Sequence, residues 1–223
     1  TLYYSDAGQY PSIHGNTYTE PLTLPGGETI IYAVSVAENG LVSPLSVMGY
    51  TVSGVIEPAV FMDPAIELAI RDLIQANGDD VLYTNDLWEI TEFTVPEGAT
   101  ILEDLALLPS LQKLTIQNNN IGTLAYLSNL TALEELDLSG SRFPADELST
   151  LANLPKLTKL TMENCGLSTI AAMTDLQNLT YLNLGGNTLR NLDALTSMTS
   201  LTELYLDHNA ITNLSALSTL SNL

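Results

Sequence analysis

Residues 111–132 read LQKLTIQNNNIGTLAYLSNLTA, and this stretch decides the fold because its pattern recurs along the rest of the chain. The pattern is L-x-x-L-x-L-x-x-N-x-I-x-x-L-x-x-L-x-x-L-x-x. Its first leucine returns in register at positions 111, 133, 157, 179, 201 and 223, which gives units of 22, 24, 22, 22 and 22 residues. A unit repeated at a fixed period of about 20–50 residues indicates a solenoid, in which each unit packs on its neighbours.

Each unit is predicted to supply one strand and one tight turn. Leu114 and Ile116 alternate with polar residues, which is the period of two expected of a short strand with one buried face. Leu124, Leu127 and Leu130 then recur every three residues, which suits a 3₁₀ turn that packs inward from the opposite side. We therefore predict an α/β leucine-rich-repeat solenoid with a parallel β-sheet on its concave face and mostly 3₁₀ turns on its convex face.

The ninth position of each unit is predicted to point inward, where a polar side chain satisfies backbone groups in the bend after the strand. It is occupied by Asn119, Ser141, Cys165, Asn187 and Asn209. Cys165 is the only cysteine of the chain, and we interpret it as a buried member of this column, with a reactive thiol as the alternative. In the longer unit, Pro144 precedes good helix formers and predicts a short helix.

Residues 58–89 are predicted to form a helical cap on the N-terminal end of the solenoid, with the repeats in residues 90–223. Asp63 suits an N-cap, Pro64 suits the first helical position, and Asn77-Gly78 is predicted to end the helix. The predicted buried face of this helix consists of Ile66, Ile70, Leu73 and Ile74. Because a new unit begins at Leu223, we expect the repeats to continue past that residue.

Two segments of this region resemble a known family. The sequences FMDPAIELAIRDLI at residues 61–74 and TNDLWEITEF at residues 84–93 are similar to the N-terminal cap and first strand of internalin-like bacterial leucine-rich-repeat proteins. The resemblance covers about residues 58–223 of the chain. It implies a surface-exposed or secreted bacterial protein that binds another protein on its concave face.

Residues 1–57 lack the leucine repeat and are predicted to form a small all-β domain. Residues 29–36 are a β-branched run, and Glu38-Asn39-Gly40 is a hairpin signal ahead of a returning strand. The segments Tyr3-Tyr4-Ser5-Asp6, 18–24 and 37–44 resemble the immunoglobulin-like domain at the C-termini of chitobiases and hexosaminidases. The resemblance implies a partial immunoglobulin-like β-sandwich with an accessory, non-catalytic role.

The chain is strongly acidic, with 26 acidic and 6 basic residues and a formal net charge of −20. Nucleic-acid affinity comes mainly from Lys and Arg, so we expect no nucleic-acid partner. The apolar runs are far shorter than the roughly 20 residues that a membrane-spanning helix needs, so we expect no membrane insertion. The acidity is interpreted as favouring solubility in an extracellular setting, with a dedicated cation site as the alternative.

No residue pattern in the sequence indicates catalysis. His14 and His208 are far apart in sequence and lack partners for a metal site. A nucleophile motif, a phosphate-binding loop and a cysteine pair are all missing from the sequence. We therefore predict no enzymatic activity, no cofactor and no metal.

The candidate binding residues are those predicted to face out of the strands, at the third, fifth, seventh and eighth positions of each unit. This face is polar except in its last two units, which carry Tyr181, Asn183, Tyr205, Asp207 and His208 beside Gly185 and Gly186. Exposed aromatic side chains with room around them are typical of an interface hot spot. The alternative is that both tyrosines are ordinary strand formers.

These features together predict a non-catalytic protein-binding module of a bacterial cell-surface or secreted protein, used in adhesion or scaffolding. The alternative function is an accessory, carbohydrate-directed region of a larger secreted hydrolase. A third hypothesis, an intracellular regulator, is disfavoured by the immunoglobulin-like neighbour. We expect an extracellular or cell-surface location, a protein as the partner, and carbohydrate as the second class of ligand.

Overall fold

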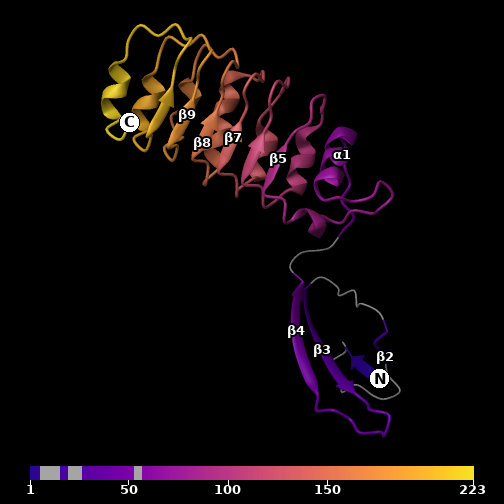
Figure 1. Cartoon of the computed structure of the whole chain (residues 1–223). Helices are drawn as coiled ribbons and strands as arrows, with labels where there is room; N and C mark the ends of the chain where they lie inside the picture. The colour runs from indigo at the N-terminus through magenta and orange to yellow at the C-terminus, as the bar shows by residue number, and fades with distance from the viewer. Residues whose placement is uncertain (6–15, 20–26, 53–56) are drawn as a thin grey trace. The chain divides into compact units, whose positions relative to one another are not determined.

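The structure, a computed structural model, describes residues 1–5, 16–19, 27–52 and 57–223. The chain divides into two compact units, Thr1–Pro58 and Ala59–Leu223 (Figure 1). The larger unit contains the leucine pattern and all the candidate binding residues.

The described part of the smaller unit forms one antiparallel sheet. Its strands are β1 (Leu2–Ser5), β2 (Asn16–Thr17), β3 (Gly27–Ser35) and β4 (Ser46–Val52), arranged in the order β2-β1-β3-β4. The hairpin predicted between β3 and β4 is present, and its connection turns at Gly40, which has a left-handed φ of 80°. The second sheet of an immunoglobulin-like sandwich stays a prediction, because part of the sequence that suggests it lies outside the described residues.

The larger unit contains the predicted parallel sheet. Its six strands are β5 (Glu92–Thr94), β6 (Lys113–Thr115), β7 (Glu135–Asp137), β8 (Lys159–Thr161), β9 (Tyr181–Asn183) and β10 (Glu203–Tyr205), and they lie in chain order. Each strand pairs in register with the next, so that Leu160, Leu182 and Leu204 are neighbours across the sheet. Equivalent positions of successive units therefore form straight columns across the strands.

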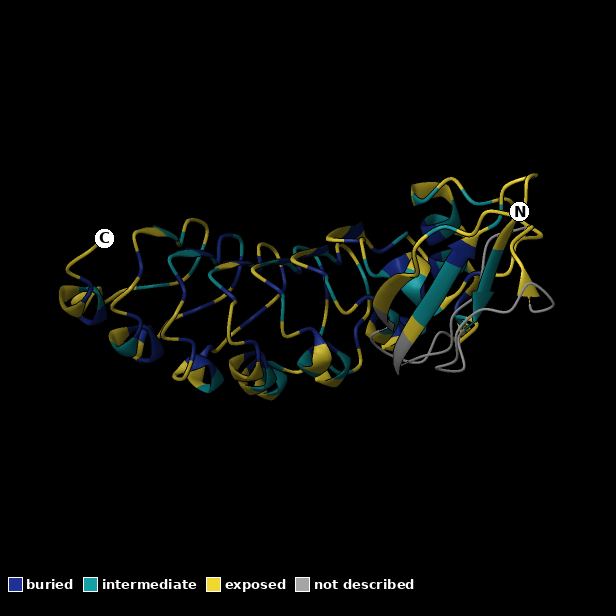
Figure 2. Cartoon of the chain, turned by 90° about the horizontal axis from the view of Figure 1, so that it is seen from below, coloured by how far each residue is buried: buried dark blue, intermediate teal, exposed yellow. Residues whose placement is uncertain are grey.

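The turns of the larger unit lie on the side opposite to the strands, with their buried residues facing inward (Figure 2). They are the 3₁₀ helices η2 (Leu102–Leu107), η3 (Ala125–Asn129), η4 (Ala145–Asn153), η5 (Ala171–Met173), η6 (Asp193–Ser197) and η7 (Ser215–Thr219). A further 3₁₀ helix, η1 (Thr84–Leu87), precedes the first strand. The short helix predicted after Pro144 is η4, which is a 3₁₀ helix. Leu148, Leu151 and Leu154 recur every three residues and are all buried, and that spacing keeps them on one face of a 3₁₀ helix.

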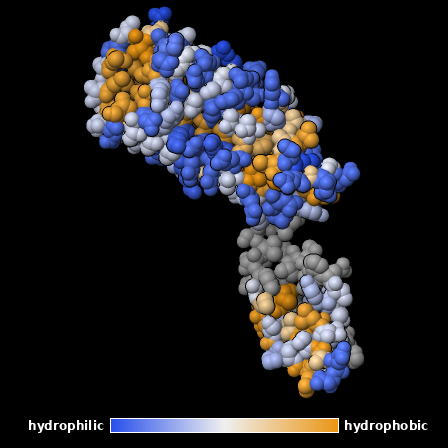
Figure 3. Space-filling view, viewed as in Figure 1, coloured by the Kyte–Doolittle hydropathy of each residue, from blue (hydrophilic) through white to orange (hydrophobic). Residues whose placement is uncertain are grey.

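The predicted leucine core is one continuous cluster from the cap to the last turn. Leu182 is fully buried, as predicted, but Leu204 is only partly buried. Leu204 lies on β10, at the edge of the sheet, and has a neighbouring strand on one side only. In Figure 3 an apolar area lies at this C-terminal end of the solenoid, where Leu214 and Leu223 are exposed.

The cap contains the helix α1 (Pro64–Leu73), which begins as predicted. The Asp63 side chain accepts hydrogen bonds from the backbone N–H groups of Ala65 and Ile66, and Pro64 occupies the first helical position. Ile66 and Ile70 are buried, as the predicted face requires. Leu73 is 51% exposed, so its assignment to that face was wrong.

The helix also ends earlier than the sequence predicts. Gln75, and not Gly78, adopts the left-handed conformation, with φ of 57°. The backbone N–H of Gln75 donates to the carbonyl of Asp72, and that of Ala76 donates to the carbonyl of Arg71. These two bonds satisfy the last helical carbonyls in the pattern of a Schellman motif, so the Asn77-Gly78 signal is not needed.

The ninth-position column is bonded to the backbone, and its members are buried except for Asn119 and Asn209, which are half-buried. The Asn187 amide donates to the carbonyls of Met162 and Leu184, and its oxygen accepts from the N–H of Leu167. Asn119 makes a weaker contribution, because it is half-buried and its amide donates only to the Gln117 carbonyl. Cys165 is 4% exposed, its thiol donates to the carbonyl of Leu138, and burial raises its pKa to about 11. These features confirm the buried interpretation of Cys165.

The eighth position of each repeat adopts a left-handed conformation. Its φ angles lie between 53° and 72° at Asn118, Gly140, Asn164, Gly186 and His208. Each of the two asparagines lies over the glycine of the next unit. A Cβ atom on Gly186 would overlap the side-chain oxygen of Asn164, and one on Gly140 would overlap that of Asn118.

Replacing Gly186 with alanine is therefore expected to lower the free energy of unfolding by about 1–3 kcal/mol, because the left-handed conformation alone costs about 1–2 kcal/mol for a residue with a Cβ. Urea denaturation followed by circular dichroism measures this change. Gly122→Ala is the matched control, since open space surrounds Gly122 and its φ is not positive. Equal losses in the two variants would contradict the assigned role of Gly186.

Candidate functional site

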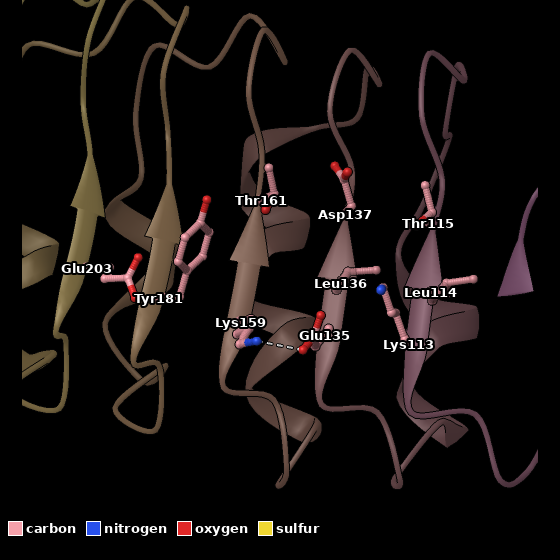
Figure 4. Close-up of a pocket in the computed structure, with 10 residues that line it drawn as sticks. All are labelled: Lys113, Leu114, Thr115, Glu135, Leu136, Asp137, Lys159, Thr161, Tyr181 and Glu203. Atoms are coloured by element: carbon pink, nitrogen blue, oxygen red, sulfur yellow. Dashed lines mark hydrogen bonds and ion pairs between the residues drawn. The ribbon is translucent and has the colours of Figure 1, made fainter. Parts of the chain in front are cut away.

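The candidate site lies on the outer surface of the six-stranded sheet, here called the strand face. It consists of the outward side chains at the third, fifth, seventh and eighth positions of the repeats. An open depression of about 410 Å³ lies on it, lined by Lys113, Leu114, Thr115, Glu135, Leu136, Asp137, Lys159, Thr161, Tyr181 and Glu203 (Figure 4). All of these residues except the two leucines come from the third and fifth positions, which the sequence analysis placed on this face.

The third position forms a column of mostly charged side chains across the sheet. In strand order it reads Glu92, Lys113, Glu135, Lys159, Tyr181 and Glu203. The Lys159 ammonium lies 2.7 Å from the Glu135 carboxylate, whose hydrogen bond and charge raise the pKa of Lys159. Lys113 lies 4.0 Å from Glu92. Exposed pairs of this kind add little stability, but they neutralise the first four strands of the column.

The two candidate tyrosines are in contact. Tyr181 is half-buried on β9, and Tyr205 is 45% exposed on β10. Their ring centroids are 5.5 Å apart and their planes are tilted by 44°. Register explains the contact, because Glu203 lies opposite Tyr181 and Tyr205 lies opposite Asn183. The structure therefore brings the tyrosines together as a single aromatic surface, here called the tyrosine pair.

The other candidate residues are engaged in hydrogen bonds within the protein, Asn183 with the backbone of Gly185 and Asp207 with His208. The side-chain oxygen of Asn183 accepts a hydrogen bond from the backbone N–H of Gly185, at 2.9 Å. The Asp207 carboxylate lies 2.7 Å from Nδ1 of His208, and this hydrogen bond lowers the pKa of Asp207. Asp207 and His208 are both exposed, whereas Asn183 is half-buried.

The room that the sequence suggested beside Gly185 and Gly186 is filled. Gly185 is buried, and a Cβ atom there would lie 3.0 Å from an Asp207 oxygen and 3.2 Å from the Asn183 oxygen. The space above Gly186 is taken by Asn164. The prediction of an open gap was wrong, because larger side chains of the same unit and of neighbouring units cover the two glycines.

Glu203 belongs to the site, although the sequence analysis did not single it out. Its carboxylate accepts a 3.4 Å hydrogen bond from the Tyr205 hydroxyl. The negative charge of Glu203 is the main cause of the raised pKa of Tyr205. The sequence could have indicated Glu203, because it is the third residue of its repeat unit and Tyr181 is the third residue of the unit before.

In the described part of the chain, no group of three or more His, Cys, Asp or Glu side chains is placed to hold a metal ion. His14, the second histidine, lies outside the described residues. Among the described residues, no helix has the length and apolar character that crossing a bilayer requires.

The parallel sheet, the 3₁₀ turns and the buried leucine and asparagine columns together define a leucine-rich-repeat solenoid. The family model described as Leucine Rich repeats (2 copies) matches residues 109–153 and 177–222. Among curated proteins, none matches the sequence at a significant level.

Among solved structures, the chain is similar to internalins of Listeria. An internalin (inlF) of Listeria monocytogenes has 28% identity and a TM-score of 0.67, with 75% of this chain and 51% of that chain covered. An internalin C2 of the same species has 29% identity and a TM-score of 0.58, with 75% and 85% covered. A leucine-rich-repeat protein of Leptospira interrogans has 25% identity and a TM-score of 0.52, with 61% and 37% covered. The chain thus spans about half the length of the inlF internalin.

Proposed function

We propose that this chain is a non-catalytic protein-binding module of a bacterial cell-surface or secreted protein, acting in adhesion or scaffolding through its strand face. The observation that carries the proposal is the tyrosine pair, two rings packed against each other at the surface of an open sheet. Similarity to internalins supports both the binding role and the location outside the cell.

The proposed binding surface consists of Tyr181, Asn183, Tyr205, Asp207 and His208. Interfaces concentrate their binding energy in a few aromatic or arginine side chains surrounded by polar contacts. The tyrosine pair supplies the aromatic centre, and Asn183, Asp207 and His208 supply polar groups beside it. The bond from the Gly185 N–H to Asn183 and the bond between Asp207 and His208 hold these groups in place before a partner arrives, which reduces the entropy lost on binding.

We also propose that the chain is divided into three regions. Residues 1–57 form a partial immunoglobulin-like β-sandwich with an accessory role, residues 58–89 cap the solenoid, and residues 90–223 carry the repeats. The bonded hairpin of β3 and β4 supports the first assignment, and the Asp63 N-cap of α1 supports the second.

Replacing Tyr181 and Tyr205 together with alanine is expected to weaken partner binding at least about tenfold, because it removes the aromatic centre of the interface. A photo-crosslinking residue in place of Thr161, which lines the same depression as Tyr181, first identifies the partner in cell extracts. Isothermal titration calorimetry with the purified partner then compares the double variant with the unchanged protein.

Tyr83→Ala is the matched control for this experiment, because Tyr83 is 41% exposed but lies in the cap, away from the strand face. It should leave the affinity unchanged. Full affinity in the double variant would place the interface elsewhere. Saturable binding of an oligosaccharide that is lost in the double variant would favour the carbohydrate-directed alternative.

A further inference from the structure

We infer that the partner presents a cationic side chain, an arginine or a lysine, to the tyrosine pair and the Glu203 carboxylate. The inference rests on the proposed function and adds the chemistry of the group that is bound. Its basis is the third-position column, in which paired charges stop one strand before the tyrosine pair begins.

The first four strands of this column pair their charges within the protein. Lys113 lies near Glu92, and Lys159 bonds to Glu135. The alternation then ends, because Tyr181 takes the next position and a second acid, Glu203, follows it. Among the described residues, Glu203 has no salt bridge, and its hydrogen bond to the Tyr205 hydroxyl is long at 3.4 Å.

The nearest lysine of the column is already engaged. Figure 4 shows the Lys159 ammonium turned towards Glu135, while the Glu203 carboxylate extends towards the Tyr181 ring. Tyr181 separates Lys159 from Glu203 in the strand order. The Glu203 carboxylate therefore has an aromatic ring beside it. The charge of Lys159 reaches it from two strands away, without the ion pair that Lys159 forms with Glu135.

This combination suits a cation that comes from outside. An ammonium or guanidinium group over a tyrosine ring is attracted by the negative face of the ring, and a carboxylate beside the ring adds a charge-assisted hydrogen bond. Arginine fits best because its planar group stacks on an aromatic ring while its N–H groups bind a carboxylate. The net charge of −20 also attracts a basic segment during approach.

Other ligand groups fit this place less well. An anionic group would be repelled by Glu203 and by Asp207, which is on the same strand face. A purely apolar group would cover the Glu203 carboxylate without supplying a hydrogen bond, and burying an unpaired carboxylate is costly. The charge of the surface therefore selects a basic partner segment.

The test uses the full 223-residue chain and a five-residue capped peptide of Gly and Ser with one central Arg. Its neutral match carries citrulline, which keeps the shape of arginine and removes its charge. NMR titration follows the ring signals of Tyr181 and Tyr205. We expect shifts of these signals with the arginine peptide, at least about fivefold weaker binding of the citrulline peptide, and further weakening of the arginine peptide at high salt.

Two variants test whether the preference for arginine depends on Glu203 and Tyr181. Glu203→Gln should weaken the arginine peptide about fivefold and leave the citrulline peptide unchanged. Tyr181→Lys places an internal cation opposite Glu203, as Lys159 lies opposite Glu135, and should abolish the preference for arginine. Glu92→Gln is the matched control, since it removes an acid of the same column about 24 Å away, five strand spacings from Glu203.

Equal binding of the two peptides, or full arginine binding by Glu203→Gln, would overturn the inference. Its failure is distinguishable from failure of the proposed function. Suppose that a captured protein partner needs Tyr181 and Tyr205 for binding but binds Glu203→Gln unchanged. The proposed function would then stand, and the inference of a cationic side chain would be rejected. If the double alanine variant still binds both the protein partner and the arginine peptide, the proposed function and the inference of a cationic side chain are both wrong.

Discussion

Replacing Asp63 with alanine is expected to lower the free energy of unfolding of the solenoid by about 3–5 kcal/mol, because four backbone N–H groups would each lose a partner. Asp63 is 3% exposed. One carboxylate oxygen accepts from the N–H groups of Ala65 and Ile66, and the other accepts from those of Thr100 and Ile101. The side chain therefore joins the start of α1 to the segment that leads into η2. Urea denaturation measures the loss.

Asp72→Ala is the matched control, because Asp72 is an exposed acid of the same helix. Its removal should change the free energy of unfolding by no more than about 0.5 kcal/mol, as is usual for surface substitutions. Similar losses for the two variants would mean that Asp63 does not hold the cap to the first repeat.

The Asp63 carboxyl also predicts the acid sensitivity of the cap. Desolvation raises the pKa of Asp63, but hydrogen bonds from Thr100, Ile101, Ile66 and Ala65 outweigh it, so the pKa lies below its ordinary value. A carboxyl whose pKa is lowered on folding contributes stability above its unfolded pKa of about 3.9, and that stability is lost as pH falls through the folded pKa. Below about pH 4, the unchanged protein should therefore lose stability more steeply than Asp63→Asn.

The repeat and the core could be predicted from the sequence, because both depend on spacing along the chain. Leu114 and Leu136 occupy equivalent places in successive units, and stacking the units forces such residues into one buried column. The N-cap at Asp63 was also predictable, since its signal lies within four residues. The contact between the tyrosines follows less directly, because it needs the register between β9 and β10.

Features set by distant side chains could not be predicted in this way. Asp104 is buried because its carboxylate accepts from the N–H groups of Met62 and Asp63, which are about forty residues earlier in the chain. The gap expected beside Gly185 is filled by Asn183 and Asp207, whose rotamers leave no trace in the spacing. The ion pair of Lys159 with Glu135, and not with Glu203, depends on the side-chain conformation of the lysine in the folded column.

Replacing Leu182 with alanine is expected to cost about 2–5 kcal/mol in free energy of unfolding, the range for truncating a buried leucine whose surroundings cannot fully collapse. Leu182 is 0% exposed and lies between Leu160 and Leu204 in the parallel sheet. Its neighbours are held by backbone bonds on both sides, such as the one from the Met162 N–H to the Asn183 carbonyl. Those bonds limit the collapse of the cavity. Urea denaturation followed by circular dichroism measures the loss.

Leu204→Ala and Lys159→Ala are the control variants for the Leu182→Ala prediction. Leu204 occupies the same position in the edge strand and is only partly buried, so the same truncation should cost less than it does at Leu182. Lys159 points out of β8 on the strand face, and its loss should leave stability nearly unchanged. Equal effects at positions 159 and 182 would mean that the two faces of the sheet are assigned the wrong way round. The tyrosine pair and Glu203 would then be core residues, and a binding surface could not be built from them.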